Sequence, residues 1–250
     1  VHRLLYDYLV GIFDKTFLYD VWSCRDGKGL LGAIERAQQF SQRFAAGWVW
    51  RADITKFFDH VNHDVLKACL RRRVNDPNAL WLLNTVIDSY VATREREREL
   101  SAPRQGIPIG NLTSQIFANI YLNELDRFVV HTLQPQAYLR YGDDFTLFVP
   151  SREEATILRE RVTHFCRDEL RLIINPKQDV IVPIRRGIFF LGVEIFPSGH
   201  RLRKRHWRRI QDRLNLQNVA SYRELIARHN PEKLHWFNWL LKEKLLDQFD

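Results

Sequence analysis

The sequence contains no methionine, few cysteines and no long apolar run, and each of these absences excludes something. A helix that spans a bilayer needs about 20 consecutive apolar residues. Neither such a stretch nor a signal peptide is visible, so we expect no membrane partner. Three widely spaced cysteines exclude a disulfide framework and a zinc pattern, and they fit a reducing, cytoplasmic compartment. A complete translation product begins with methionine, so a chain that begins at Val1 is expected to be a fragment.

The chain has enough apolar residues for a sizeable core and an excess of positive charge. Its 250 residues are 45% hydrophobic, which predicts one large domain or a domain with a small appendage. The formal net charge is +8, which favours a polyanionic partner such as a nucleic acid. No internal repeat or low-complexity segment divides the chain.

Hydrophobic periodicity predicts a mixed helix and strand fold. Helices are expected over 1–17, 30–44, 63–73, 77–92, 114–131 and 153–166, and strands over 48–54, 137–139, 145–149, 172–174 and 180–182. Residues 187–195 read as a further hairpin element, and 94–99 as a solvated charged hairpin or linker. The character changes near Pro197, and the remainder to Asp250 is expected to form three helices.

An acidic pair stands at a tight turn between two of the expected strands. Tyr141-Gly142-Asp143-Asp144 separates two apolar runs, and adjacent acids there repel each other and add nothing to a core. A polar turn that happens to be acidic is one interpretation. The other is a divalent-metal site, because Mg²⁺ prefers carboxylate oxygens and leaves room for substrate phosphates.

A third acid, Asp53, stands at the end of the expected strand over 48–54, close to the apolar pair Phe57-Phe58. By itself it reads as a cap or turn residue, although a charge at this position needs a partner or a metal. If the Asp143-Asp144 turn packs beside it, three carboxylates converge. Convergent carboxylates are what two-metal phosphoryl transfer requires.

These residues together resemble a reverse transcriptase over nearly the whole chain. The likeness rests on five motifs in the family's order: Asp53 with Phe57-Phe58, the loop 106–115, Tyr141-Gly142-Asp143-Asp144, Asn175-Pro176-Lys177 and Phe190-Leu191-Gly192. It implies an α+β fold of the right-hand polymerase type, with an antiparallel palm sheet that bears the catalytic aspartates. Residues 1–197 would form partial fingers and the palm, and 198–250 a basic helical thumb. The earliest fingers motifs would lie upstream of Val1.

The resemblance also implies roles for individual residues. Asp53 and Asp143 would bind two Mg²⁺ ions, for which Mn²⁺ can substitute, with the Ile54 backbone carbonyl as a further ligand. Asp144 would ligate one ion or position the primer 3′-hydroxyl. Lys177 would give a proton or positive charge to the departing pyrophosphate, although a solvated surface lysine fits as well.

Further residues are expected around the incoming nucleotide and the nucleic acid. Phe58 occupies the family's gate against the ribose 2′-hydroxyl, with a plain core phenylalanine as its alternative. The other nucleotide contacts implied are Ile109, Gly110, Gln115 and Tyr141. The nucleic-acid contacts implied are Arg25, Lys28, Phe190, Leu191, Gly192, Arg203, Lys204, Arg205 and Arg208. A solvated turn explains Arg25 and Lys28 equally well, and a solvated helix face is the alternative for the basic stretch 201–209.

The loop at Ile109 narrows the expected subfamily. Most reverse transcriptases carry Gln-Gly there and Ser-Pro further on, whereas this chain has Ile109-Gly110 and Ser114-Gln115. The pattern resembles the reverse transcriptases of diversity-generating retroelements, found in bacteria, archaea and phages, which copy a template RNA with errors at adenines. An apolar Ile109 offers no hydrogen bond near the nascent base pair, so low fidelity is expected. A small basic accessory protein, oligomeric in the family, would accompany template RNA, cDNA primer and dNTPs.

Three other interpretations stay open. Group II intron-like and retron-type reverse transcriptases share the motifs. RNA-dependent RNA polymerases also carry Gly-Asp-Asp, but they place an acid where this chain has Phe58. A catalytically silent RNA-binding scaffold on a polymerase fold is the third, and the intact Asp53, Asp143 and Asp144 argue against it.

Overall fold

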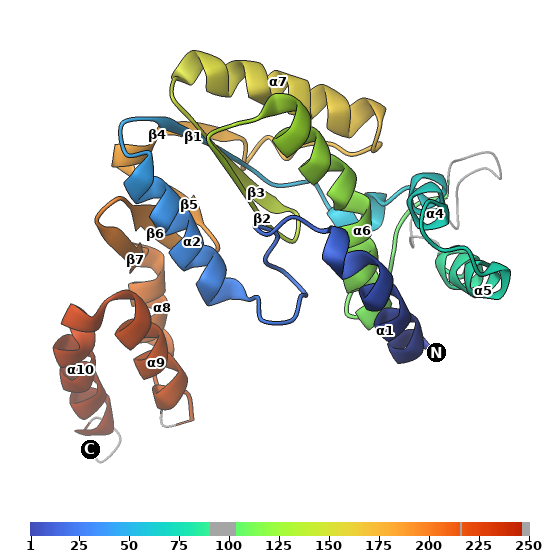
Figure 1. Ribbon diagram of the computed structural model, residues 1–250. Helices are drawn as coiled ribbons and strands as arrows, with labels where there is room; N and C mark the ends of the chain where they lie inside the picture. Colours follow the sequence, from blue (N-terminus) through green and yellow to red (C-terminus); the bar gives the residue numbers. More distant parts are fainter. Residues whose placement is uncertain (91–103, 216, 247–250) are drawn as a thin grey trace.

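The computed structural model describes residues 1–90, 104–215 and 217–246 (Figure 1). The helices are α1 (His2–Phe13), α2 (Leu30–Arg43), α3 (Phe57–His60), α4 (His63–Arg71), α5 (Pro77–Asp88), α6 (Leu112–Arg127), α7 (Arg152–Asp168), α8 (Lys204–Arg213), α9 (Val219–His229) and α10 (Leu234–Leu246). The strands are β1 (Trp48–Ala52), β2 (Ala137–Tyr141), β3 (Asp144–Val149), β4 (Val180–Pro183), β5 (Ile188–Phe190), β6 (Val193–Phe196) and β7 (Gly199–Leu202). The charged run 94–99 lies outside the described residues.

The larger sheet is antiparallel, with the strand order β2-β3-β1-β4. Its strands coincide with the β-branched and aromatic runs that the sequence singled out. The expected strand over 172–174 is not a strand, because only Ile174 pairs, through a single bridge to Ile54. Arg171 just before it has a positive φ of 54°. The chain therefore bends into position and crosses the end of β1 at a single residue.

Side-chain alternation divides the core into two layers on opposite faces of this sheet. Trp50 and Ala52 of β1 belong to a cluster that includes residues of α1, α6 and α7. Val49, which precedes Trp50 and points to the opposite face, belongs to a second cluster, with residues of α2 and of the smaller sheet. Figure 1 shows α6 and α7 on one side of the strands and α2 with β5–β7 on the other.

The smaller sheet, β5-β6-β7, is also antiparallel and spans the point at which the sequence changes character. β7 was not expected from the sequence, which predicted helices directly after Pro197. Its register with β6 pairs Leu202 with Val193 and buries both apolar side chains. The helices therefore begin only at Lys204.

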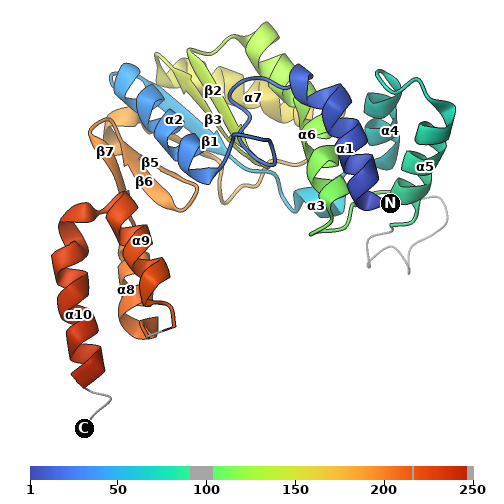
Figure 2. The same ribbon diagram turned by 60° about the horizontal axis from the view of Figure 1, so that its bottom comes forward.

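Helices α8, α9 and α10 form what we call the C-terminal helical unit, and their number agrees with the prediction for this segment. The unit projects from the rest of the chain beside β7, and α4 and α5 lie at the opposite end (Figure 2). None of the described helices is long and apolar enough to cross a membrane.

The remaining helices follow the predicted ranges with shifted ends. α1 stops at Phe13 and gives way to a 3₁₀ turn, Asp14–Thr16. α6 continues as a π-helical turn, Phe128–Leu133, which passes the end of the range expected to be helical. α5 begins with Pro77 after an Asp76 cap that accepts two backbone N–H bonds.

Candidate active site

The register of the larger sheet brings Asp53 beside the acidic turn. Ala52, the last residue of β1, pairs with Phe145, so the next position along β1 faces Asp144. Residues that are directly opposite in an antiparallel pair point to the same face. Asp53 and Asp144 therefore share a face at this end of the sheet, and Asp143 lies in the adjoining turn. We call Asp53, Asp143 and Asp144 the acidic strand end.

The turn that carries Asp143 is a two-residue hairpin loop. Tyr141 pairs with Asp144, which leaves Gly142 and Asp143 between the strands. Gly142 has a φ of +65°, a conformation that favours glycine. Its N–H donates to the Ser23 hydroxyl at 2.9 Å, and its carbonyl accepts from Arg140 Nη1 at 2.8 Å. The turn is therefore fixed from both sides by side chains outside it.

A fully buried ion pair holds Arg140 in place. Both Arg140 and Asp126 have 0% exposed side chains, and two hydrogen bonds of 2.7 and 2.6 Å join them. Tyr138 donates to the same carboxylate at 2.7 Å, and Asn119 accepts from Arg140 at 3.1 Å. A buried pair of this kind is tolerated only when its other hydrogen-bonding groups are satisfied, as they are here. The network orients the acidic turn.

Asp144 is bound to an arginine that the sequence reading did not consider. Arg51 donates to both of its carboxylate oxygens, at 3.0 and 2.9 Å, with the two side chains only 11% and 18% exposed. Arg51 also donates to Gln178 at 2.9 Å. Arg51 precedes Asp53 by two residues, so strand alternation puts both side chains on one face. The acids therefore divide into a clamped Asp144 and a pair, Asp53 and Asp143.

Asp53 is positioned by the segment that crosses the end of β1. The Asn175 N–H donates to the Asp53 backbone carbonyl at 3.0 Å, and the Asn175 side chain hydrogen-bonds its carboxyl group. The Oδ1 atom of Asp53 is buried and has no hydrogen-bond partner. A buried oxygen left in this way is costly unless something else binds it.

Burial raises the pKa of every member of the acidic strand end. For Asp53, desolvation outweighs the hydrogen bond from Asn175 and the charge of Arg51, which lower its pKa. For Asp143, desolvation comes first, and the nearby charge of Asp53 raises the pKa further. The pKa of Asp144 rises to about 6, by desolvation and in spite of Arg51. Carboxylates that repel one another in a desolvated place are typical of functional sites.

These residues fit a divalent cation through two carboxylates. Within the described parts of the chain, no group of three or more His, Cys, Asp or Glu is arranged to hold a metal ion, which agrees with the engagement of Asp144 by Arg51. Mg²⁺ needs only one or two protein carboxylates, because water and substrate phosphates complete its shell. The unpartnered Asp53 oxygen and the mutual repulsion of Asp53 and Asp143 match that need. The Ile54 carbonyl stays a predicted ligand.

The residues expected at the nucleotide lie on α3, on the loop before α6, on α6 and at the end of β2. Phe58, on α3, is partly buried with its ring 5.3 Å from that of Phe57, so both gate and core roles remain open. Ile109 is 77% exposed, an unusual state for a large apolar side chain, and Gly110 beside it is also exposed with a φ of +95°. Gln115, on α6, and Tyr141 are partly exposed.

Two predicted nucleic-acid contacts near the N-terminus are engaged inside the protein instead. The Arg25 side chain, 11% exposed, pairs with Asp14 at 2.7 Å and donates to the Leu18 carbonyl at 2.7 Å. Lys28 Nζ donates to the Tyr19 carbonyl at 2.8 Å and lies 3.4 Å from the centre of that ring. Arg25 is therefore not a solvated turn cation, whereas Lys28 is partly exposed. Through these contacts both side chains help to hold the segment that carries Ser23 in place.

The hairpin expected to touch the primer presents a different residue from the one predicted. Phe190 is fully buried in the core, so its side chain does not reach a nucleic acid. Leu191 and Gly192 form the β5–β6 turn, with positive φ angles of 50° and 89°. Alternation turns Phe189 outward, where three guanidinium groups lie over its ring: those of Arg51 (5.3 Å), Arg203 (3.4 Å) and Arg205 (5.1 Å).

The remaining predicted cations are accessible. Lys177, in the turn after Asn175, is exposed, and its backbone N–H donates to the Asn175 side chain at 3.1 Å. Lys204, Arg205 and Arg208 are exposed along α8, and Arg203 before them is partly exposed. The Phe189 ring therefore lies between Arg51, which binds Asp144, and the two arginines at the start of α8.

The sequence reading missed the residues that hold the acids rather than the acids themselves. Arg51 could have been found from its two-residue spacing to Asp53, and Arg140 from its charge within an apolar strand. Asn175 belongs to one of the five motifs, but the role expected there was that of Lys177. Ser23 and Asn119 carry no local signal, because their partners are brought to them only by the tertiary fold.

Known proteins resemble this chain in sequence and in fold. Residues 2–195 match the family described as "Reverse transcriptase (RNA-dependent DNA polymerase)". Protein YkfC of Escherichia coli (strain K12) is 27% identical over 178 residues, 58% of this chain and 46% of the relative. Group II intron-encoded protein LtrA of Lactococcus lactis subsp. cremoris is 21% identical over 213 residues, 60% of this chain and 35% of the relative.

A solved structure of telomerase from Candida tropicalis with a TWJ fragment of telomeric RNA has a similar fold. Its TM-score is 0.57 at 11% sequence identity, over 99% of this chain and 45% of that chain. The chain described here spans less than half the length of the curated relatives that it matches.

Proposed function

This chain belongs to the reverse transcriptase (RNA-dependent DNA polymerase) family, and from that premise we propose that its acidic strand end catalyses RNA-templated DNA synthesis. The observation that carries the proposal is the desolvated pair Asp53 and Asp143, with an unpartnered buried oxygen on Asp53. A binding scaffold has no use for buried carboxylates that repel each other. Their placement costs stability, and a cation bound between them would offset that cost.

Asp53 and Asp143 would hold two Mg²⁺ ions, or Mn²⁺ in their place. When bound, these ions lower the pKa of an attacking primer 3′-hydroxyl and neutralise the leaving pyrophosphate. The protein's own part is to fix both carboxylates before substrate arrives. The Asn175 contacts do this for Asp53, and the Arg140 network does it for the turn that carries Asp143. Asp144, held by Arg51, would position the primer end rather than carry a full metal shell.

The surrounding residues would select and orient the substrates. Phe58 would close the site against a ribose 2′-hydroxyl, which favours dNTPs over rNTPs. Ile109, Gly110, Gln115 and Tyr141 would contact the nascent base pair, and Lys177 would meet the departing pyrophosphate. The larger sheet and its helices would act as palm and partial fingers, up to about residue 197 or, following β7, about residue 203. The C-terminal helical unit would be the thumb, with Arg203, Lys204, Arg205 and Arg208 toward the template–primer backbone.

Two subfamilies compete for this chain. The Ile109-Gly110 loop resembles the enzymes of diversity-generating retroelements, which would add error-prone copying and a small basic accessory protein. Similarity to the group II intron-encoded protein LtrA favours a group II intron-like reverse transcriptase at least as well. We propose that the chain is a group II intron-like reverse transcriptase. Error-prone copying caused by Ile109 is a separate property, which can be tested by itself.

Primer extension on an RNA template tests the proposed function. Asp143→Asn should abolish extension and retain RNA binding, because it removes a metal ligand and keeps the shape of the turn. Asp64→Asn, an exposed aspartate on α4, is the matched control and should extend normally. Extension that survives in Asp143→Asn would refute the assignment of the site.

A further inference from the structure

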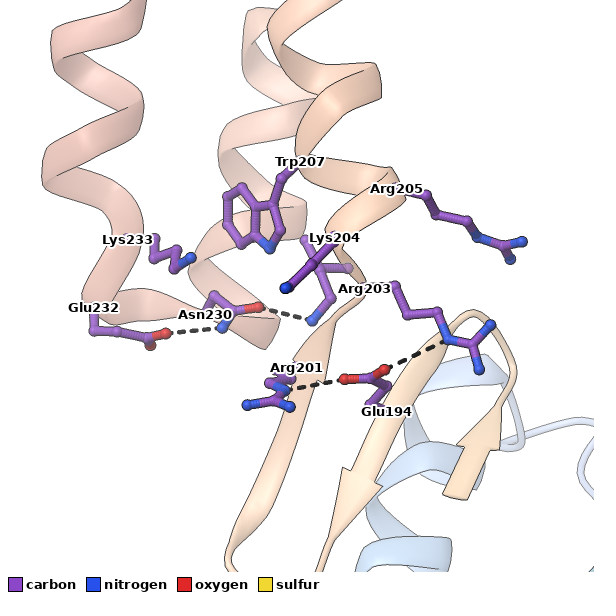
Figure 3. Close-up of a pocket in the computed structure, with 10 residues that line it drawn as sticks. Glu194, Arg201, Arg203, Lys204, Arg205, Trp207, Asn230, Glu232 and Lys233 are labelled. Atoms are coloured by element: carbon purple, nitrogen blue, oxygen red, sulfur yellow. Dashed lines mark hydrogen bonds and ion pairs between the residues drawn. The ribbon is translucent and has the colours of Figure 1, made fainter. Parts of the chain in front are cut away.

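A cavity of about 490 Å³ lies where the C-terminal helical unit meets β6 and β7, apart from the acidic strand end. Four segments line it: β6, the end of β7, the start of α8 and the turn before α10 (Figure 3). Its volume is within the range of small-molecule sites and admits one nucleotide. Because its walls come from separate segments, the cavity is a product of the fold rather than a roughness of one surface.

Positive charge dominates the lining. The basic residues are Arg201, Arg203, Lys204, Arg205 and Lys233, against the acids Glu194 and Glu232. The carboxylate of Glu194 is already paired with cations of the lining, with Arg201 at 3.0 Å and with Arg203 at 3.6 Å. Lys204 and Arg205 are exposed, and neither forms an ion pair with an acid of the described residues. This side of the cavity therefore offers cations to a phosphate group.

An aromatic ring stands at the centre of the same cavity. Trp207 is partly buried, with Trp236 edge-on to it at 5.4 Å and Lys233 Nζ 4.6 Å from its ring centre. An exposed cation–π contact contributes about 0.5–1 kcal/mol, whereas a base stacked on an aromatic side chain contributes about 1–3 kcal/mol. Lys233 is exposed, so an incoming base can displace it with a net gain.

The side of the cavity opposite the arginines carries hydrogen-bonding groups of the other polarity. The Asn230 amide donates to Glu232 at 2.8 Å, and this bond lowers the pKa of the Glu232 carboxyl. Glu232 therefore remains a carboxylate, which repels a phosphate and accepts from the amino groups of a base. Figure 3 shows Glu232 with Lys233 on one side of Trp207, Arg203 and Arg205 on the other, and Asn230 below the ring. The lining thus has a base end and a phosphate end.

We propose that this cavity binds a single unpaired nucleotide of a nucleic-acid strand, with its base against Trp207 and its phosphate toward Lys204 and Arg205. Within a duplex the bases are paired and stacked, so no single base can leave its neighbours and enter the cavity. A strand that has left the duplex presents both a base face and its phosphates. The inference takes from the proposed function only that the chain handles nucleic acid, and it concerns a separate site.

Fluorescence anisotropy with three matched substrates tests the proposal. These are a blunt RNA–DNA duplex, the same duplex with a short single-stranded RNA overhang, and that overhang made abasic, so that only its bases are missing. The wild-type protein should bind the overhang substrate about 5- to 150-fold more tightly than the blunt one, given the usual contribution of a stacked base. The abasic overhang should lose most of that gain.

Variants locate the effect. Trp207→Leu should remove the preference for the overhang and leave blunt-duplex binding within about twofold. Lys204→Glu should also remove the preference, but it should weaken blunt-duplex binding as well, because Lys204 is a proposed contact of the duplex backbone. Arg209→Glu makes the same change of charge on an exposed residue of α8 that does not line the cavity. It should weaken binding of all three substrates alike and leave their ratios unchanged. Trp207→Phe keeps a ring and should keep part of the preference, which guards against a misfolded Trp207→Leu protein.

Equal affinity of the wild-type protein for intact and abasic overhangs would overturn the proposal, since that result needs no base contact. A preference that persists in both Trp207→Leu and Lys204→Glu would overturn it as well. Binding is measured without dNTPs or metal and can be repeated with Asp143→Asn. Failure of the polymerase assignment would therefore appear in extension only, and failure of the nucleotide site in these binding ratios only.

Discussion

The acidic strand end and the C-terminal helical unit handle charge in opposite ways. At the acidic strand end two arginines are held by short bonds: Arg51 donates two hydrogen bonds to Asp144, and Arg140 holds the turn from a wholly buried position. Along α8 the cations are exposed, and Lys204 and Arg208 extend into solvent. Buried, bonded charges fix atoms to the accuracy that chemistry needs. Exposed charges set an attractive field whose strength is shared among many residues. Single substitutions should therefore be severe at the first region and graded at the second.

The largest effect is expected within the acids themselves. Asp53→Asn should lower the rate of primer extension by at least about 10³-fold. The substitution removes a negative charge whose stabilising effect on the reaction is complete only when substrate is bound. Asp144→Asn should cost clearly less, since its carboxylate is engaged by Arg51. Single-turnover rates with both variants measure the difference. Equal losses of rate in the two variants would show that Asp144 binds metal as fully as Asp53 does.

Loss of the buried arginine should reach the whole fold. Arg140→Gln leaves the Asp126 carboxylate buried without its partner, which should lower the free energy of unfolding by about 3–5 kcal/mol. Arg3→Gln breaks an exposed pair with Asp7 and should change it by less than about 1 kcal/mol. Urea denaturation followed by circular dichroism compares the two. A small loss in Arg140→Gln would mean that the network does not hold the turn.

The pH dependence of stability should expose the repulsion among the acids. Burial raises the pKa of Asp143 above its unfolded value of 3.8, and that of Asp144 to about 6. A raised folded-state pKa means that protonation stabilises the fold at pH below the unfolded value, and that this contribution is lost as pH rises through the folded-state pKa. In metal-free buffer, Asp143→Asn should be measurably more stable than wild type at pH 7.5, because the amide does not ionise.

That gap should close as pH falls toward 4, where the wild-type carboxylates take up protons. Thermal unfolding at several pH values measures it. If the difference in stability between Asp143→Asn and wild type stays constant or widens on acidification, the carboxylates of the acidic strand end do not destabilise the fold by repelling one another.

A moderate and uniform effect is expected in the C-terminal helical unit. Arg208→Ala should weaken binding of an RNA–DNA duplex a few-fold for every sequence and reduce the slope of log affinity against log salt by about one. Titrations between 50 and 300 mM salt, with Asp212→Asn on the same helix as a control, would measure this slope. An unchanged slope would remove α8 from the duplex-binding surface.

The smallest effect is expected on fidelity. Ile109→Gln supplies a hydrogen-bonding side chain in place of an apolar one that is 77% exposed, so misincorporation opposite adenine should fall by up to about tenfold. Sequencing of extension products measures the error spectrum. If the spectrum opposite adenine does not change, low fidelity does not arise from Ile109.

The sequence predicted the acids and their strands because both rest on local patterns. Alternating apolar residues around Asp143 define a hairpin, and Asp53 ends a strand that is antiparallel to it. What surrounds them depends on register and long-range packing. Alternation buries Phe190 and exposes Phe189, and Arg25 turns inward because Asp14, eleven residues earlier, lies within reach. The sequence pattern did not indicate β7, because this strand runs into a cation-rich stretch that is typical of a helix. β7 forms because the edge of β6 is available for pairing.

The most direct measurement of the central claim is primer extension on an RNA template with dNTPs or rNTPs supplied separately. The account predicts DNA synthesis with dNTPs, dependence on added Mg²⁺ or Mn²⁺, little use of rNTPs because of Phe58, and no product from Asp143→Asn. Extension with rNTPs alone would contradict it and make the chain an RNA polymerase. So would the absence of any extension by a wild-type protein that binds the same template–primer, which would make it a scaffold.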